Sequence, residues 1–333
     1  MTKPFDHQQA AHCETGVVSN LMRHHGLQLS EPMVFGLASG LTYAYLPVVK
    51  INGLPLMAYR MPPRMIIKLL AKRINGLKIR FETFRNEQDG MKALDSKLAD
   101  KEVVGLQTSV FFLPYFPQAM RFHFNAHNLL VYGKEEDQYH ISDPVFSHTV
   151  QTDSNSLQKA RFTRGALAPK GMMYYFESVP DSIDFEKIIP KAIRFTGRMN
   201  GRWNPIPIAG INGMNMVAKK IEKLHKTDPR YARLFLGHIV RMQEEIGTGG
   251  AGFRFMYATY LQESSEMFSD KLLAQLAEQM TKAGDEWREF ALLAARMSKQ
   301  RGEQEFPDIA QQLRKAAKME LEIYNELSSY KIS

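Results

Sequence analysis

The stretch HCETGVVSNLMRHHG, residues 12–26, decides how the first half of the chain is interpreted. Its apolar residues recur at helical spacing before the stop signal of a glycine: Val17, Val18, Leu21, Met22 and then Gly26. The pattern predicts a helix that begins at Cys13, the single cysteine of the chain. The backbone amides and the dipole at a helix N-terminus stabilise a thiolate, and a neighbouring imidazolium would complete a reactive pair. Cys13 is therefore the candidate nucleophile.

The candidate partners of Cys13 lie in two strand-like runs, HNLLVYG from His127 and QYHISDP from residue 138. A charged turn between the runs predicts a hairpin, which would place His127 beside Asp143. The carboxylate would then fix the imidazole tautomer and orient the ring toward a nucleophile. Each residue taken singly has a plainer interpretation, because strand-end histidines are mostly structural and aspartates before proline mostly form turns.

Strand and helix signals are mixed up to about residue 180 and are helical beyond it. Residues 27–60, rich in Gly, Pro and aromatic residues, are expected to form loop and short turns, and MIIKLLAKR after the two prolines predicts a helix. We therefore predict an α+β domain over residues 1–180 and an all-α domain over residues 181–333.

Composition is that of a soluble globular chain, since 333 residues, 44% of them hydrophobic, can bury two cores. A single cysteine excludes an intramolecular disulfide, and without an HExxH motif zinc binding is not expected. No apolar run is long enough for a transmembrane helix, and the N-terminus lacks the apolar core of a signal peptide. We expect a cytoplasmic protein with no membrane partner.

The net charge is +8, and a dense basic segment over residues 60–85 contributes to it. Within this segment Arg64, Lys68 and Lys72 are four residues apart, which predicts one shared helix face. Such a face favours an acidic partner, and nucleic acid is the weaker choice because no aromatic-interleaved motif accompanies it. A solvated helix face is the plain alternative.

A second motif, GTGGAGF at residues 247–253, is rich in glycine and precedes a helical pattern. Phosphate binding is one interpretation, because helix N-termini bind anions. The motif lacks the Gly-Lys-Ser/Thr ending of a P-loop, and no strand precedes it. A loop that opens a helix is the better interpretation.

The order of Cys13, its helix, the HNLLVYG strand and Asp143-Pro144 resembles papain-like bacterial families related to the C39 bacteriocin-processing peptidases. A closer resemblance covers nearly the whole chain. HCETGVVSNLMRHHGLQLSEPMVFGLASGLTY at residues 12–43 and IGTGGAGFRFMYATYLQESSE at residues 246–266 look like the butirosin biosynthesis protein H family. That family joins a papain-like N-terminal domain to a helical domain of poorly defined role.

The family resemblance implies an acyltransferase that takes an acyl group from the phosphopantetheine thioester of an acyl carrier protein and hands it to a small-molecule amine. Carried over to this chain, Cys13 would be acylated, His127 would act as base and acid, and Asp143 would orient the ring. The resemblance to papain-like enzymes also suggests an upstream glutamine in the oxyanion hole, for which Gln8 is a better candidate than Gln9. No cofactor of its own is implied, because phosphopantetheine arrives on the donor.

Two other functions are compatible with the same residues. The first is a cysteine peptidase or amidase, which would use the same triad on a peptide or amide bond. The second is a non-catalytic module that binds a carrier protein. The basic face at Arg64, Lys68 and Lys72 would dock an acidic carrier protein in the transferase, whereas the module would use its helical half as the interaction surface. The helical half is compatible with closure over the site, with binding of the acceptor and with formation of a homodimer.

Overall fold

The structure is a computed structural model that describes residues 5–51, 53–165, 167–245, 247–301 and 305–332. Two compact units account for these residues. The first unit contains the described residues up to Val34 together with Pro63–Ile183. The second contains Phe35–Pro62 together with the described part of the chain from Asp184 onward. The chain therefore enters the second unit twice.

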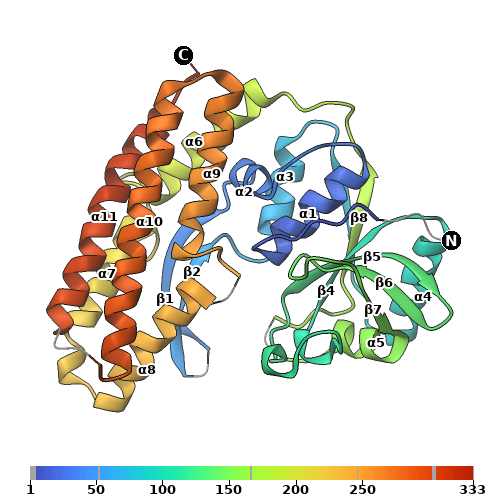
Figure 1. The fold of residues 1–333 in the computed structure, drawn as a ribbon, viewed down its shortest axis with the longest axis horizontal. Helices are drawn as coiled ribbons and strands as arrows, with labels where there is room; N and C mark the ends of the chain where they lie inside the picture. Colours follow the sequence, from blue (N-terminus) through green and yellow to red (C-terminus); the bar gives the residue numbers. More distant parts are fainter. Residues whose placement is uncertain (1–4, 52, 166, 246, 302–304, 333) are drawn as a thin grey trace. The chain divides into compact units, whose positions relative to one another are not determined.

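The first unit is built on a six-stranded antiparallel sheet with the strand order β3-β8-β4-β5-β6-β7 (Figure 1). Its strands are β3 (Lys78–Glu82), β4 (Val104–Thr108), β5 (His127–Glu135), β6 (Gln138–Ser142), β7 (Val150–Asp153) and β8 (Met173–Ser178). Its helices are α1 (Cys13–His24), α3 (Met65–Arg73), α4 (Glu87–Ala99) and α5 (Ser154–Phe162). The prediction of an α+β N-terminal half is confirmed.

The two faces of this sheet are covered by different helices. On one face, Leu106 and Leu129 belong to a buried cluster that includes Leu94 of α4 and Leu157 of α5. On the other face α1 packs against β5, and the side chain of Tyr174 lies near the start of α1. Alternation of side chains along the strands produces this division, because successive residues point to opposite faces.

The β5–β6 hairpin contains one irregularity. Val131 pairs with Ile141. Gly133, two residues further along β5, pairs with His140, only one residue earlier in β6. Tyr132 is therefore an extra residue, a β-bulge, in β5. The bulge shifts the pairing of every residue on its His127 side by one position.

The second unit consists of a β-hairpin and a group of helices. The hairpin strands are β1 (Leu41–Ile51) and β2 (Leu54–Arg60), preceded by α2 (Glu31–Leu37), which begins in the first unit. The α-helices are α6 (Phe185–Asn200), α7 (Gly210–Glu222), α8 (Pro229–Val240), α9 (Arg254–Phe268), α10 (Lys271–Ser298) and α11 (Phe306–Ser329). The prediction of a helical C-terminal half is confirmed (Figure 1).

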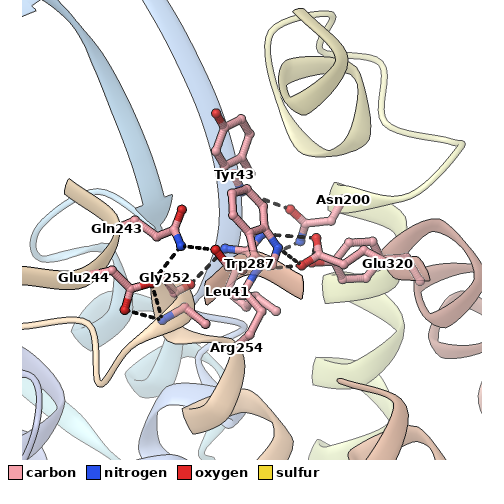
Figure 2. Close-up of polar contacts among 11 residues, drawn as sticks. Leu41, Tyr43, Asn200, Gln243, Glu244, Gly252, Arg254, Trp287 and Glu320 are labelled. Atoms are coloured by element: carbon pink, nitrogen blue, oxygen red, sulfur yellow. Dashed lines mark hydrogen bonds and ion pairs between the residues drawn. The ribbon is translucent and has the colours of Figure 1, made fainter. Parts of the chain in front are cut away.

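A buried polar cluster connects three of these helices (Figure 2). Arg254 at the start of α9 donates to Glu320 of α11 over 2.6 Å and 3.1 Å, and both side chains are fully buried. Trp287 of α10 donates its indole N–H to the same carboxylate at 2.6 Å. The ring of Trp287 also packs against Tyr43 and Tyr59 of the hairpin. Because Arg254 and Glu320 form an ion pair, each compensates the buried charge of the other.

The expectation of loop and short turns over residues 27–60 is wrong. Most of this segment forms α2 and the β1–β2 hairpin, although its Gly and Pro content is typical of turns. The predicted contiguous division at 180/181 also differs from the structure, because residues 35–62 belong with the helices. The physical reason is the burial of Tyr43 and Tyr59 against Trp287, a contact between residues remote in sequence. Within the described residues, no helix is long and apolar enough to span a bilayer.

Candidate active site

Cys13 is the first residue of α1, as the sequence predicts, and its side chain is partly exposed. His12 caps the helix, since its Nδ1 accepts a hydrogen bond from the Thr15 amide at 3.4 Å. The backbone before the helix is held by one carboxylate. Glu31 accepts hydrogen bonds from the amides of Ala11 at 2.9 Å and His12 at 2.7 Å. These contacts fix the chain that leads into Cys13.

His127 is the first residue of β5, and its imidazole is buried. Its Nε2 donates a hydrogen bond of 2.7 Å to Oδ2 of Asp143, which is also fully buried. The side chain of Cys13 hydrogen-bonds to the same imidazole. Because Nε2 is used by Asp143, Nδ1 is the nitrogen left for the thiol. The structure thus brings the three predicted residues Cys13, His127 and Asp143 into one hydrogen-bonded chain.

The protonated form of His127 is strongly favoured. Burial alone lowers the pKa of the imidazole, but the charge and hydrogen bond of Asp143 and the contact with Cys13 outweigh burial and raise the pKa to about 10. At neutral pH the ring therefore carries a proton. An imidazolium beside a thiol favours the thiolate, which is the nucleophilic form of cysteine.

Asp143 has two further hydrogen-bond donors. The amide of Val145 donates to Oδ1 at 3.1 Å, and the hydroxyl of Tyr115 donates to Oδ2 at 2.9 Å. The next residue, Phe116, places its ring edge-on to the imidazole of His127, with centroids 5.4 Å apart. The sequence analysis did not identify Tyr115, because it lies in an irregular segment whose only signal is the aromatic run FLPYFP.

Two local features place Asp143 beside His127 and α1 beside Pro144. The bulge in β5 places Asp143 opposite Leu129, so its side chain shares a sheet face with His127. A Cβ on Gly16 would lie 2.8 Å from the Cβ of Pro144, so glycine is needed for the approach of α1. The amide of Ala10 also donates to the carbonyl of Pro144 at 2.8 Å.

Gln8, the predicted oxyanion-hole donor, is fixed by hydrogen bonds between its backbone and the side chain of Asn20. Its amide donates to Oδ1 of Asn20 at 3.2 Å, and Nδ2 of Asn20 donates to its carbonyl at 2.9 Å. The side chain of Gln8 is exposed. Gln9 donates its side-chain amide to the carbonyl of Val145 at 3.1 Å. A role for Gln8 in the oxyanion hole stays a prediction.

The predicted basic helix face is only partly correct. Arg64 is the N-cap of α3 and has a left-handed backbone, with φ of 70°, so it lies outside the helix. Its guanidinium donates to the side chain of the buried Gln107 at 3.0 Å. Lys68 and Lys72 lie four residues apart within α3 and are both exposed. The face therefore consists of Lys68 and Lys72 without Arg64.

The glycine-rich motif at residues 247–253 opens a helix, α9, as predicted. The amide of Ala251 donates to both carboxylate oxygens of Glu244, each at 3.2 Å. The guanidinium of Arg254 is committed to Glu320 and to the carbonyl of Gly252 (Figure 2). The carboxylates of Glu244 and Glu320 therefore occupy the donors that a phosphate would otherwise bind.

Two shallow surface grooves lie along α10, with volumes of about 540 and 410 Å³. The larger is lined by residues of mixed charge that include Glu244, Asp285 and Arg288. The smaller is bordered by Arg296, Lys299 and Arg301. None of the residues around Cys13 lines either groove. The two grooves and Cys13 therefore lie in different parts of the chain. The chemistry of Cys13, rather than the volume of a groove, identifies the candidate active site.

Two family models match parts of the chain. A family model described as "Butirosin biosynthesis protein H, N-terminal" matches residues 12–144, which include Cys13, His127 and Asp143. A second model, described as "Domain of unknown function (DUF4872)", matches residues 155–327, just over half of the chain. Its match begins at α5 of the first unit and runs through the helices of the second. No curated protein matches the chain significantly.

Among solved structures, one similar chain is a candidate C39-like peptidase from Bacillus anthracis. Sequence identity is 12%, the TM-score is 0.37, and the alignment covers 54% of this chain and 96% of that chain. A likeness of this size says nothing about activity. The family assignment rests instead on the DUF4872 model, which matches just over half of the chain. The chain belongs to the DUF4872 family, and its residues 12–144 are similar to the N-terminal domain of butirosin biosynthesis protein H.

Proposed function

We propose that the chain is an acyltransferase that moves an acyl group from an acyl-carrier-protein thioester to an amine through an acyl-enzyme on Cys13. The single observation that supports this function best is the hydrogen-bonded chain of Cys13, His127 and Asp143. It lies within the segment that matches the butirosin biosynthesis protein H family, whose resemblance implies acyl transfer. The acyl group and the amine are left open.

In the first half-reaction the thiolate of Cys13 attacks the carbonyl carbon of the donor thioester. The tetrahedral intermediate carries an oxyanion, which the backbone amides at the start of α1 would stabilise. Its collapse breaks the bond to the pantetheine sulfur. The imidazolium of His127 gives its proton to that sulfur, which leaves as a thiol, and a thioester on Cys13 is formed.

In the second half-reaction the amine attacks the carbonyl carbon of the acyl-enzyme. Neutral His127 accepts a proton from the nitrogen, and the thiolate of Cys13 leaves as the amide forms. The thiolate–imidazolium pair is thereby regenerated. Asp143 keeps its Nε2 partner throughout, so the imidazole stays oriented with Nδ1 toward the sulfur.

Two alternatives use the same residues and differ in acceptor or in reactivity. A cysteine peptidase or amidase would pass the acyl group to water, and the chemistry of the nucleophile would be unchanged. A non-catalytic carrier-binding module would keep Cys13 as an unreactive thiol. The polarised hydrogen-bond chain around His127 favours a reactive cysteine over the module.

The deciding experiment is intact-mass analysis after incubation with acyl-pantetheine thioesters, for the wild type and for Cys13→Ala. Transferase and hydrolase both predict a mass increment of one acyl group in the wild type alone. Addition of amines then separates them, because only a transferase releases an acyl-amide. Absence of any adduct, together with slow alkylation of Cys13, would reject both enzymes and favour the module.

For the donor, we propose that the exposed Lys68 and Lys72 of α3 dock an acidic carrier protein. Charge reversal at both positions is expected to weaken carrier binding about tenfold at low salt and to leave turnover of free acyl-pantetheine unchanged. Arg64→Gln is the matched control, because Arg64 is engaged by Gln107. Equal carrier affinity of the wild type and the Lys68→Glu/Lys72→Glu variant would remove this proposal.

A further inference from the structure

Among the described residues, Tyr115 is the one donor to Asp143 that comes from neither the hairpin nor the turn that follows it. It belongs to the segment between β4 and β5, which also supplies the ring of Phe116 against His127. The hydroxyl of Tyr115 donates to Oδ2, the same oxygen that accepts Nε2–H of His127. Two donors therefore share one carboxylate oxygen.

The hydroxyl of Tyr115 can only act as a protonated donor in this position. Burial raises the pKa of Tyr115 well above its ordinary value, and the charge and hydrogen bond of Asp143 raise it further. The phenol thus stays protonated throughout the pH range in which a cysteine enzyme works. Each hydrogen bond that a carboxylate accepts offsets part of its negative charge and weakens its hold on the other donors.

We propose that Tyr115 is a positioning residue that shares Oδ2 of Asp143 with His127 and so limits how tightly the carboxylate holds the imidazolium proton. The proposal rests on the proposed function, in which His127 must both release and regain a proton. A carboxylate that held the imidazolium too firmly would slow proton transfer to the leaving thiol. Tyr115 would therefore adjust the proton affinity of His127 through Asp143, without contacting the substrate.

The groups that face this site come from several parts of the first unit. Cys13 of α1, Tyr115 and Asp143 contact His127 or its carboxylate. Glu14 and Tyr174 lie near Cys13, as the effect of their charges on one another shows. On the N-terminal segment, His7 contacts Oγ of Ser142 at 2.8 Å and the carbonyl of Phe146 at 2.9 Å, on either side of Asp143. Apart from Tyr115, these groups are common to every variant below.

The test is the pH dependence of Cys13 alkylation by iodoacetate, compared with iodoacetamide and measured without any acyl donor. Iodoacetate is an anion, so it reacts faster while the neighbouring imidazolium is charged, and its rate falls when His127 loses its proton. In the wild type we expect this fall near pH 10. Tyr115→Phe should move it upward by about 0.5–1 pH unit, the size expected for loss of one hydrogen bond to a charged group.

A matched control exists in the same sheet. Tyr139 is buried and donates to Oδ1 of Asp95 at 2.6 Å, so Tyr139→Phe also deletes a tyrosine–carboxylate bond. It should leave the iodoacetate profile where the wild type has it. Equal shifts in Tyr115→Phe and Tyr139→Phe would overturn the proposal, because a general loosening of the unit would then explain both. An unshifted profile in Tyr115→Phe would also overturn it.

A second variant tests the opposite direction and keeps the tyrosine in place. Replacing Tyr115 with 3-fluorotyrosine makes the phenol a stronger donor, so the fall in iodoacetate reactivity should move to lower pH. A structural role alone does not produce shifts of opposite sign. Because no acyl donor is used, a chain that alkylates with these profiles but transfers no acyl group would refute the proposed function and leave the role of Tyr115 intact.

Discussion

His127 is buried between Asp143, which favours the imidazolium, and Cys13, whose thiolate does the same. This environment has a consequence for stability as well as for reactivity. A histidine whose pKa rises on folding, from an ordinary 6.5 to about 10, binds a proton more tightly in the folded state than in the unfolded chain. The resulting stabilisation is fully present below pH 6.5 and is lost as the pH rises toward 10.

This stabilisation can be measured in a Cys13→Ala background, which removes the titration of the thiol. We expect the difference in unfolding free energy between Cys13→Ala and Cys13→Ala/His127→Ala to be a few kcal/mol at pH 6. It should shrink progressively from pH 6.5 toward pH 10. Urea denaturation at pH 6, 8 and 10 measures it, and titrating groups that do not contact His127 or Asp143 cancel in the difference. A difference that does not change with pH would contradict the His127–Asp143 coupling.

At the scale of single residues, the sequence singled out the three residues that the structure brings together, because each of them stands at a local landmark. Cys13 begins a helix, His127 begins a strand, and Asp143 precedes a proline. Tyr115 has no such landmark. Its role depends on folding the irregular 109–126 segment back onto Asp143, a tertiary contact that no local pattern encodes.

At the scale of elements, helices were easier to predict than strands. The helix after Pro63 was expected from MIIKLLAKR and is α3, but the helix begins at Met65, so Arg64 leaves the row that its spacing suggested. The β1–β2 hairpin was missed altogether. Its strands are defined by burial of Tyr43 and Tyr59 against Trp287, and Gly and Pro around them gave a turn signal instead.

The buried Arg254–Glu320 pair joins α9 to α11 and gives a prediction at this scale. Glu320→Gln leaves the guanidinium of Arg254 buried without its counter-charge, and we expect it to cost about 3–5 kcal/mol of unfolding free energy. Arg254→Met combined with Glu320→Gln should recover most of that loss, since the glutamine still offers an acceptor to Trp287. Urea denaturation measures both.

An exposed ion pair serves as the control for this prediction. Arg314 and Glu222 also approach to 2.6 Å, but each side chain keeps 37% of its surface exposed. Glu222→Gln should therefore cost less than about 1 kcal/mol. If Glu320→Gln were as mild as Glu222→Gln, the buried pair would not hold these helices together.

At the scale of the whole molecule, the chain forms the start of its first unit, crosses into the second at residue 35 and returns at residue 63. The sequence indicated two parts and the approximate place of the last crossing, at residue 184, because the pattern changes there from mixed to helical. It did not indicate the crossings at residues 35 and 63. The hairpin belongs to the second unit because Tyr43 packs against Trp287, about 240 residues further along the chain. The periodicity of a sequence gives no information about such a remote contact.

A cut near residue 180 should therefore leave Trp287 without its hairpin partners. In a Trp203→Phe background, Trp287 is the only tryptophan, and it is 0% exposed in the full chain. We expect the fragment 184–333 to emit at longer wavelength than the full chain, and an added peptide of residues 35–62 to reverse the shift. Identical emission from fragment and full chain would show that the helices bury Trp287 unaided.

Because Tyr132 is an extra residue in β5, it decides which residues of the hairpin have side chains on the same sheet face. In a hairpin closed by a two-residue turn, such as that between Glu135 and Gln138, residues separated by an odd number of positions share a face. His127 and Asp143 are separated by an even number, so they meet only because the bulge corrects the count. Relatives with the same turn and an odd separation should have a regular strand, and those with an even one should carry the bulge. Evolution can lengthen or shorten this hairpin one residue at a time only by gaining or losing the bulge in the same step.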